Sequence, residues 1–390
     1  MPTDLSTMMQ LRESVRRFVR ERLIPNERTV EESDAIPADI RAEMCGLGLF
    51  GLTIPEEYGG LGLNTEEEMQ IVYEVAHASA AYRSCFGSTI GIGSQGIVLD
   101  GTAEQKQNYL PRMAKGEVIA SFALTEPDIG SDAAHLRLSA RRDGDSFVLN
   151  GTKRFITNAP EAHVFTVMAR SDPAASGADG ITAFLVERGT SGLRLGKIDR
   201  KLGHHGSHTC DVFFDDVRVS RNAIIGGKEG RGFVTAMKVL DRGRLHIAAA
   251  CCGAAERLIE MMLDYASGRI QFGKPICEHQ LVQGLIADSK RDSYVAWCAV
   301  LDACRRRDAG ERATTFAACV KYFASEMVWR VADAAVQVHG GNGYMQDFRV
   351  EQFLRDVRLY RLYEGTSQIQ QLIIARDLLK GHRGSAPSQS

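Results

Sequence analysis

The chain has 390 residues, and its 47 Lys and Arg residues nearly balance its 49 Asp and Glu residues. This length favours two or three domains over one simple core. The balanced charge, without a long basic stripe, argues against a nucleic-acid partner, and no apolar run approaches the length of a membrane span. The N-terminus lacks a signal-peptide core, and the nine cysteines show no metal-ligand spacing. We therefore expect a cytoplasmic protein with no metal site and no membrane insertion.

Residues 1–120 have a helical pattern and form the first predicted domain. Asn64 and Thr102 each stand three positions before a side chain that can reach back, Glu67 and Gln105, which is typical of a capping box at a helix start. Apolar residues then recur at helical spacing. These features predict an N-terminal helical domain.

Residues 121–228 change to the period-two alternation of β-strands. The turn signals Asp143-Gly144 and Asn150-Gly151 enclose a short apolar run. No helical segment separates the strands, so the pattern predicts an antiparallel barrel or sandwich. The predicted strands include residues 136–140, 146–149, 164–168, 181–186 and 212–214.

Residues 229–390 return to helices, which are longer than those of the first domain. Short links between long helices favour an antiparallel bundle. The tail, residues 381–390, is expected to be flexible because it is rich in small and polar residues. The predicted helices cover residues 232–267, 275–307, 312–339, 350–362 and 367–379.

A carboxylate, a glycine and two hydroxyl side chains meet just before the last helix, at Glu364, Gly365, Thr366 and Ser367. A carboxylate with no obvious cation nearby in the sequence could act as a base for carbon-acid chemistry. Equally, Thr366 or Ser367 could simply cap the helix, with Glu364 solvated in front of it. The segment alone leaves both interpretations open.

Two segments near the start of the β region offer a surface for a flat ligand. The loop 122–132 combines Pro127 and Gly130 with hydroxyl side chains, so it can present backbone N–H groups to an anionic or carbonyl-rich ring. Phe155 and Thr157 fall on one face of a strand, where they could cover a ring and bond its edge. A plain turn and a core Phe are the structural alternatives.

Two glycine-rich segments interrupt the C-terminal helices. Arg269, within residues 268–275, could serve a phosphate or lie in an exposed loop. Residues 337–344 resemble a phosphate loop only weakly, because no strand precedes them. We expect His339 to end a helix rather than bind a metal. The chain has no Gly-x-Ser-x-Gly elbow, so the sequence does not support a serine hydrolase.

In their order and spacing, these segments resemble the acyl-CoA dehydrogenase family of flavoproteins, from the N-terminal helix to about Leu379. Each motif is weak alone, but the series is specific. The motifs are LTEPDIGSD (124–132), FIT (155–157), DRGR (241–244), RIQFGKP (269–275), EHQ (278–280), QVHGGNGY (337–344) and YEGTSQ (363–368).

The resemblance implies a mainly α fold with an N-terminal helical domain, a middle antiparallel β-barrel domain and a C-terminal four-helix bundle. It also implies noncovalent FAD between the subunits of a homotetramer, built as a dimer of dimers, and a role in fatty acid β-oxidation. The implied substrate is an acyl-CoA, and the implied electron acceptor is an electron-transferring flavoprotein. The implied FAD contacts are Phe122, Leu124, Thr125, Gly130, Ser131, Phe155, Thr157, Arg269, Gln271, Phe272, Gln280, Gln337, Gly341, Thr366 and Gln368. The implied contacts to the coenzyme A thioester are Ser131, Asp241, Arg244, Gly365 and Arg376.

By the same resemblance, Glu364 occupies the position of the family's usual base. Members without a base there carry a Glu in the long bundle helix, where this chain has Gly243. The implied reaction removes the α-proton of the thioester through Glu364 while the β-hydride passes to flavin N5, and it makes a trans-2-enoyl-CoA. The thioester oxygen is stabilised in the family by a flavin ribityl hydroxyl and by the backbone N–H of the base residue.

Some residues depart from the family pattern. Phe155 stands where many members have Trp, Ile129 replaces a small residue, and His204-His205 stand where Arg is frequent. These differences bear on how the substrate is held rather than on FAD binding.

The sequence gives few indications of which acyl group the protein prefers. Small residues in the predicted helix 84–95 either leave room for a medium or branched acyl chain or allow close helix packing, which we favour. The adjacent Arg83 could bind an acidic acyl terminus or face solvent, and we expect it to face solvent. Two alternative functions remain: an oxidase or specialised member acting on an unusual acyl group, and a noncatalytic FAD-binding scaffold or nucleic-acid-binding relative. The balanced charge argues against the second. Glu364 argues against the scaffold.

Overall fold

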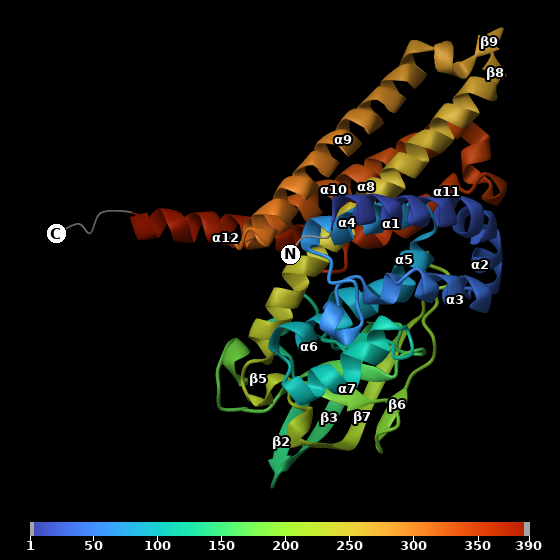
Figure 1. Cartoon of the computed structure of the whole chain (residues 1–390). Helices are drawn as coiled ribbons and strands as arrows, with labels where there is room; N and C mark the ends of the chain where they lie inside the picture. Colours follow the sequence, from blue (N-terminus) through green and yellow to red (C-terminus); the bar gives the residue numbers. More distant parts are fainter. Residues whose placement is uncertain (1–3, 386–390) are drawn as a thin grey trace. The chain divides into compact units, whose positions relative to one another are not determined.

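The structure is a computed structural model that describes residues 4–385. It divides into two compact units. A mixed unit comprises residues 25–64 and 80–240 and contains the main sheet, whereas a helical unit comprises residues 5–24, 65–79 and 241–385. Figure 1 labels their elements, and the predicted order of helices, then strands, then long helices is confirmed.

The helices of the mixed unit are short, and α7 begins as predicted. Thr102 Oγ1 accepts the N–H of Gln105 at 3.2 Å, and Gln105 Oε1 accepts the N–H of Thr102 at 3.0 Å, which completes the capping box. The predicted helix over 84–95 is not regular, because α5 continues into a π-helical turn over Ser88–Gly93. These helices are α2 (Glu27–Ser33), α3 (Ala38–Gly46), α5 (Ala80–Gly87), α6 (Gln95–Asp100) and α7 (Ala103–Ala114).

The sheet of the mixed unit has the strand order β1-β4-β2-β3-β7-β6, with β5 paired to β4. Most pairs are antiparallel as predicted, but β1 runs parallel to β4, and β2 meets β4 through one parallel residue pair. The Asp143-Gly144 turn links β2 to β3 as expected. The strands are β1 (Ala120–Ala123), β2 (Ser139–Asp143), β3 (Ser146–Thr157), β4 (Val164–Arg170), β5 (Ile181–Glu187), β6 (Leu193–Leu195) and β7 (Thr209–Ser220).

Two predictions about this unit are wrong. Asn150-Gly151 is not a hairpin turn: β3 runs through it, and the pairing with β7 shifts register between Leu149 and Gly151, so the pair forms a bulge. Arg83 does not face solvent, because only 6% of its surface is exposed on α5.

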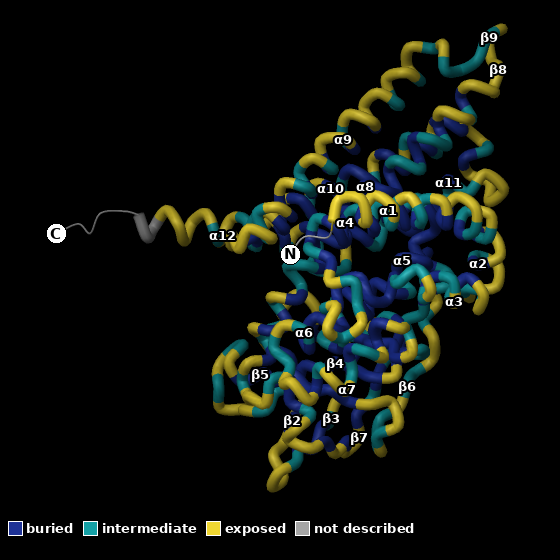
Figure 2. Tube along the Cα trace, in the orientation of Figure 1, coloured by how far each residue is buried: buried dark blue, intermediate teal, exposed yellow. Residues whose placement is uncertain are grey.

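The helical unit is built around long helices, which Figure 1 shows clearly. Most of α8 from residue 245 onward is buried, whereas much of α9 is exposed (Figure 2). A Cβ on Gly253 of α8 would lie 2.2 Å from the Tyr73 carbonyl oxygen, so this glycine lets α4 pack against α8. The elements are α1 (Leu5–Phe18), α4 (Thr65–Val75), α8 (Gly232–Gly268, whose start lies in the mixed unit), β8 (Ile270–Gln271), β9 (Lys274–Pro275), α9 (Gln280–Asp308), α10 (Thr314–His339), α11 (Val350–Val357) and α12 (Ser367–Ser385).

The ends of several helices differ from the sequence prediction. Pro275 belongs to β9, so α9 begins later than expected, and α11 gives way to a 3-10 turn over Arg358–Arg361. The first part of the tail expected to be flexible is the end of α12, and residues 386–390 lie outside the described part of the chain. Within residues 4–385, no helix has the length and apolar character that spanning a membrane requires. All nine cysteines are free thiols.

Candidate active site

Glu364 lies in a tight turn between the 3-10 segment and α12. Its φ is +56°, and that of Gly365 is +86°, so two consecutive residues adopt the left-handed conformation. This conformation is uncommon for a residue with a side chain and persists only where the surroundings enforce it. Directly after the turn, Thr366 Oγ1 accepts the N–H of Ile369 at 3.2 Å and caps α12, as predicted.

The carboxylate of Glu364 occupies the space next to Gly243 on α8. A Cβ built on Gly243 would lie 2.6 Å from Oε2 of Glu364 and 3.1 Å from its Cδ. No side chain could occupy position 243 unless the carboxylate moved. The structure therefore brings together the two positions, 364 and 243, at which the family resemblance allows a base.

Two buried side chains hold the backbone of this turn, and sequence reasoning missed both. Lys321 Nζ donates to the Gly365 carbonyl oxygen at 2.7 Å. Gln370 Nε2 donates to the carbonyl oxygens of Glu364 and Gly365 at 3.1 and 2.9 Å. Both side chains are fully buried. Lys321 stands among the apolar residues of the buried face of α10, and this pattern could have indicated a buried lysine.

Charged groups surround the ammonium of Lys321. Burial lowers the pKa of Lys321 to about 8, although electrostatic interactions with Cys251 and Glu364 oppose that effect, while Arg244 adds to it. The Glu364 carboxylate therefore has a cation in its surroundings, contrary to the impression given by the sequence.

The DRGR segment of α8 places two predicted substrate contacts side by side. Arg244 Nη1 donates to Asp241 Oδ1 at 2.5 Å, and Thr314 Oγ1 donates to Asp241 Oδ2 at 2.8 Å. Arg244 is buried, whereas Arg376 is exposed on α12. The pair of Asp241 and Arg244 thus borders Gly243 on the same helix.

In the mixed unit, the predicted flavin contacts form a partly exposed wall. Phe122 and Leu124 are half-buried, and the Phe155 ring is 58% exposed. Gly130 faces open space, since a Cβ there would meet nothing within 4 Å. The other predicted contacts of this wall are the partly or fully exposed hydroxyl residues Thr125, Ser131 and Thr157.

A buried ion pair fixes the loop of this wall, and sequence reasoning did not find it. Lys153 Nζ donates to Glu126 Oε1 and to the Leu124 carbonyl oxygen, each at 2.9 Å. The Glu126 carboxylate also accepts the N–H groups of Arg137 and Leu138 at 2.7 and 2.8 Å. Burial lowers the pKa of Lys153 to about 8, although Glu126 opposes this effect. These contacts tie the loop to Lys153 of β3 and to the backbone of residues 137–138.

A bulge in β3 presents the Phe155 ring. The pairing of β3 with β7 shifts register between Lys153 and Ile156, and the φ of Phe155 is +58°. The Arg154 guanidinium lies 4.6 Å from the centre of the Phe155 ring. The bulge therefore turns this aromatic side chain outward while Lys153 stays buried.

The remaining predicted FAD contacts lie at the β8–β9 end of the helical unit, apart from Thr366 and the exposed Gln368 at the start of α12. The ring of Tyr265 stacks on that of His339 at 4.3 Å, and Asn342 Nδ2 donates to the Tyr265 hydroxyl at 2.9 Å, so the ends of α8 and α10 are neighbours. His339 ends α10, as expected. The exposed predicted contacts at this end are Arg269, Gln271, Phe272, Gln280, Gln337 and Gly341.

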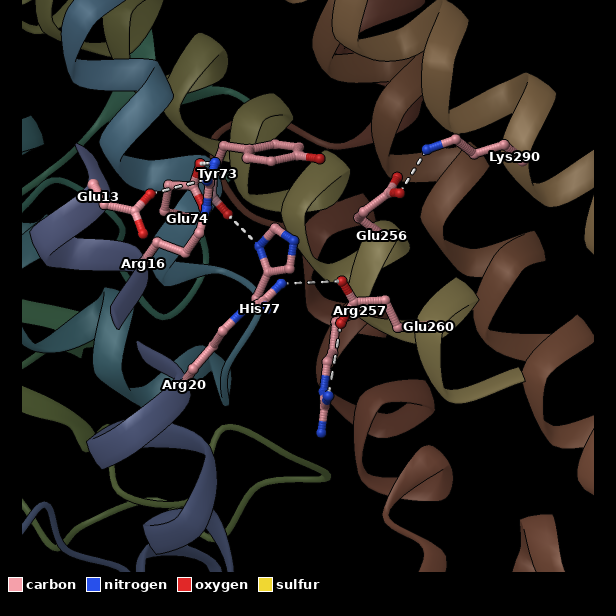
Figure 3. A network of polar contacts seen from close by, with 10 residues as sticks. All are labelled: Glu13, Arg16, Arg20, Tyr73, Glu74, His77, Glu256, Arg257, Glu260 and Lys290. Carbon is pink, nitrogen blue, oxygen red and sulfur yellow. Dashed lines mark hydrogen bonds and ion pairs between the residues drawn. The ribbon is translucent and has the colours of Figure 1, made fainter. Parts of the chain in front are cut away.

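The helical unit also contains a polar cleft of about 800 Å³ between α1, α4 and α8 (Figure 3). Burial raises the pKa of Glu74, but hydrogen bonds from Arg16 and Arg12 outweigh it and hold that pKa below its usual range. Within the described residues, no predicted site residue lines this cleft. Its ion pairs fix α1 against α4, and we assign it no chemistry.

Comparisons with known proteins match this architecture along nearly the whole chain. Residues 6–117, 121–217 and 230–379 match the N-terminal, middle and C-terminal domain models of acyl-CoA dehydrogenases. An acyl-CoA dehydrogenase of Bacillus subtilis is 39% identical over 96% of this chain and 98% of its own.

Two solved structures share the fold. Butyryl-CoA dehydrogenase from Megasphaera elsdenii is 33% identical with a TM-score of 0.92, over 97% of this chain and 99% of its own. A chain from the structure of the electron transferring flavoprotein of Acidaminococcus fermentans is 34% identical with a TM-score of 0.93, over 97% of this chain and all of its own.

The chain belongs to the acyl-CoA dehydrogenase family. It is an oxidoreductase that acts on a CH–CH donor, and FAD is its cofactor. The wall in the mixed unit fits this cofactor, because an exposed aromatic ring, apolar neighbours and hydroxyl groups suit the face and the edge of a flavin ring.

Proposed function

We propose that the protein removes two hydrogens from C2 and C3 of an acyl-CoA thioester and releases a trans-2-enoyl-CoA, with Glu364 as the base. The observation that supports this most strongly is the position of the carboxylate. In a strained turn, it fills the space beside Gly243, so a carboxylate stands where the family needs one while position 243 itself has no side chain.

A thioester C2–H is far less acidic than a carboxylic acid, so a carboxylate alone is not a sufficient base. The enolate-like charge needs hydrogen-bond donors, and water must be excluded so that the carboxylate is more basic than in solution. The half-buried turn of Glu364 provides part of that environment. FAD, when bound, supplies the acceptor for the hydride from C3.

The other residues of the site bind and orient. Phe122, Leu124, Phe155 and Thr157 would cover the flavin, and Thr125, Gly130 and Ser131 would line its edge. The start of α12, with Thr366 and Gln368, would hold the diphosphate portion of FAD, because its N–H groups favour anions. The exposed residues at the β8–β9 end would reach the FAD of a neighbouring subunit; they are Arg269, Gln271, Phe272, Gln280, Gln337 and Gly341. Ser131, Asp241, Arg244, Gly365 and Arg376 would contact the coenzyme A thioester.

The test is Glu364→Gln, which keeps the shape of the side chain and removes the base. We expect the variant to retain FAD. Its rate of flavin bleaching by a panel of acyl-CoAs under anaerobic conditions should fall by about 10²–10⁴-fold, because proton abstraction is lost. Stopped-flow absorbance of the flavin measures this rate directly.

Glu256→Gln is the matched control, since Glu256 is paired with Lys290 in the Figure 3 network. This control should bleach at the wild-type rate. Bleaching of Glu364→Gln at a near-wild-type rate would rule out the base assignment. Rapid release of hydrogen peroxide by the wild type in air would instead favour the oxidase.

We also propose a homotetramer, with an electron-transferring flavoprotein as the electron acceptor in fatty acid β-oxidation. The support for assembly is the apolar surface of the helical unit: Phe272 is 94% exposed, Leu281 is 89% exposed and Tyr344 is 84% exposed. Light scattering on the holoenzyme tests the assembly. Reduction of an added electron-transferring flavoprotein by the substrate-reduced enzyme tests the partner.

A further inference from the structure

The backbone that carries Glu364 is held by donors from two helices of the helical unit. Lys321 on α10 and Gln370 on α12 both donate to the Gly365 carbonyl oxygen, and Gln370 also donates to that of Glu364. A Cβ on Gly365 would lie 2.6 Å from Nε2 of Gln370, so the contact requires glycine. The two carbonyl groups are therefore pinned on one side of the turn, and their positions determine where the Glu364 side chain leaves the backbone.

Lys321 is an unfavourable choice for packing alone. Its side chain is fully buried in α10, and burial of an ammonium is costly unless the charge meets a specific partner. The charged and titratable groups around it are Glu364, Cys251 and Arg244 from the turn and α8, and Glu326 from α10 itself. A methionine would fill the same space without that cost. The ammonium must therefore do something that an apolar side chain cannot.

We propose that Lys321 is a positioning residue of the dehydrogenation, whose buried ammonium holds the Gly365 carbonyl and so keeps the Glu364 carboxylate beside Gly243. This inference rests on the proposed function, because it assigns a supporting group to the base. Lys321 touches the backbone of the turn and acts on the reaction through Glu364.

Glu326 of α10 binds the residues on either side of the turn, but it does not bind the carbonyl oxygen of Gly365 that Lys321 binds. Glu326 Oε1 accepts hydrogen bonds from Ser367 Oγ and Arg361 Nε at 2.6 and 2.8 Å, so the residues flanking the turn are tied to α10. Between these ties, Glu364 adopts the left-handed conformation, which is uncommon for a residue with a side chain. Without Lys321, Gln370 alone would hold two carbonyls, and the turn could relax toward an ordinary conformation.

The test compares Lys321→Met with the wild-type holoenzyme by anaerobic stopped flow, with each rate normalised to bound FAD. Loss of the ammonium should lower the limiting rate of flavin bleaching by about 10–100-fold, because small displacements of a reacting group have effects of this size. The dissociation constant for acyl-CoA, from the same titration, should change by less than about threefold, since positioning acts on the chemical step. A protein that lost only stability would instead lose FAD or melt earlier, with an unchanged rate per flavin.

Ser325→Ala is the matched control, because Ser325 is also fully buried on α10 and its hydroxyl donates to the Tyr322 carbonyl oxygen of its own helix. It should bleach at the wild-type rate. If Lys321→Met does not fold, Lys321→Arg keeps a buried cation while displacing its donors from Gly365, and it should show the same fall in rate. A rate per flavin within about twofold of the wild type in the folded lysine variant overturns the proposal.

Glu364→Gln, measured in parallel, separates the two ideas. If it is inactive while the lysine variant is normal, the base assignment stands and the positioning role is wrong. If Glu364→Gln bleaches at the wild-type rate, the base assignment itself has failed, and the positioning role fails with it.

Discussion

Each of the two units contains a fully buried lysine next to predicted site residues, and the two lysines differ in the groups to which they donate hydrogen bonds. Lys153 in the mixed unit forms an ion pair with Glu126, whose carboxylate also binds two backbone amides. Lys321 in the helical unit bonds a backbone carbonyl at the Glu364 turn. Burial lowers the pKa of each to about 8.

Under the proposed function, Lys153 has a structural use and Lys321 supports the reaction. The ion pair of Lys153 satisfies its charge locally and ties the loop of the wall to β3. At the Glu364 turn, Lys321 donates to the carbonyl oxygen of Gly365, next to the residue that we propose as the base. Both lysines donate to a backbone carbonyl oxygen, that of Leu124 for Lys153 and that of Gly365 for Lys321, so the hydrogen bond of Lys153 to a carboxylate is what distinguishes them.

Moving the base between the two positions that the structure brings together has the largest expected effect. Glu364→Gly should lower the rate of flavin bleaching by about 10²–10⁴-fold. Adding Gly243→Glu to that variant should recover at least about tenfold, because the vacated space beside α8 would then receive a carboxylate from the other side. Anaerobic stopped flow measures both rates.

The pair Glu364→Gly with Gly243→Gln is the control, since it fills the same space without a base. Equal rates for the Glu and Gln double variants would show that the space beside Gly243 is not where the proton is removed. Gly243→Glu in the wild-type background should be impaired as well, because two side chains would compete for one space.

Much of the fold followed from local patterns, whereas the supports of the site did not. The capping box at Thr102, the cap at Thr366 and the long helices depend on residues close in sequence, so they were predictable. The bulge at Asn150-Gly151 depends on β7, about 60 residues away, and a local turn signal could not reveal it. Lys321 lies 44 positions before the residue whose carbonyl oxygen it binds, and a contact between residues so far apart in the sequence cannot be predicted from a local pattern.

Arg83 and Lys153 illustrate the same limit. Sequence reasoning treats a charged side chain as solvated by default, since most are. Both of these are buried, Arg83 on α5 and Lys153 on β3. Glu126 belongs to the motif LTEPDIGSD (124–132), but nothing in that motif identifies Lys153 as the partner of its carboxylate.

Lys153→Met should destabilise the loop of the flavin wall by about 3–5 kcal/mol, because it leaves the buried Glu126 carboxylate without its cation. Lys321→Met should cost less, at most about 1.5 kcal/mol, since the Gly365 carbonyl keeps its hydrogen bond from Gln370 and the buried ammonium is removed. Hydrogen exchange at the Arg137 and Leu138 amides, which bind Glu126, reports the first change. Exchange at the Gln370 amide, in the first turns of α12, reports the second. A larger cost for Lys321→Met would contradict the distinction between the two lysines.

The smallest expected effects come from the two helix caps, one in each unit. Thr102→Ala and Thr366→Ala should each lower local stability by about 1 kcal/mol, because each removes an acceptor for an amide in the first turn. Exchange at the Gln105 and Ile369 amides measures these losses. Only Thr366→Ala should also reduce the FAD content of the purified protein, because we place only that helix start at the cofactor. Equal FAD contents in the two variants, with both caps lost, would remove the start of α12 from the proposed FAD site.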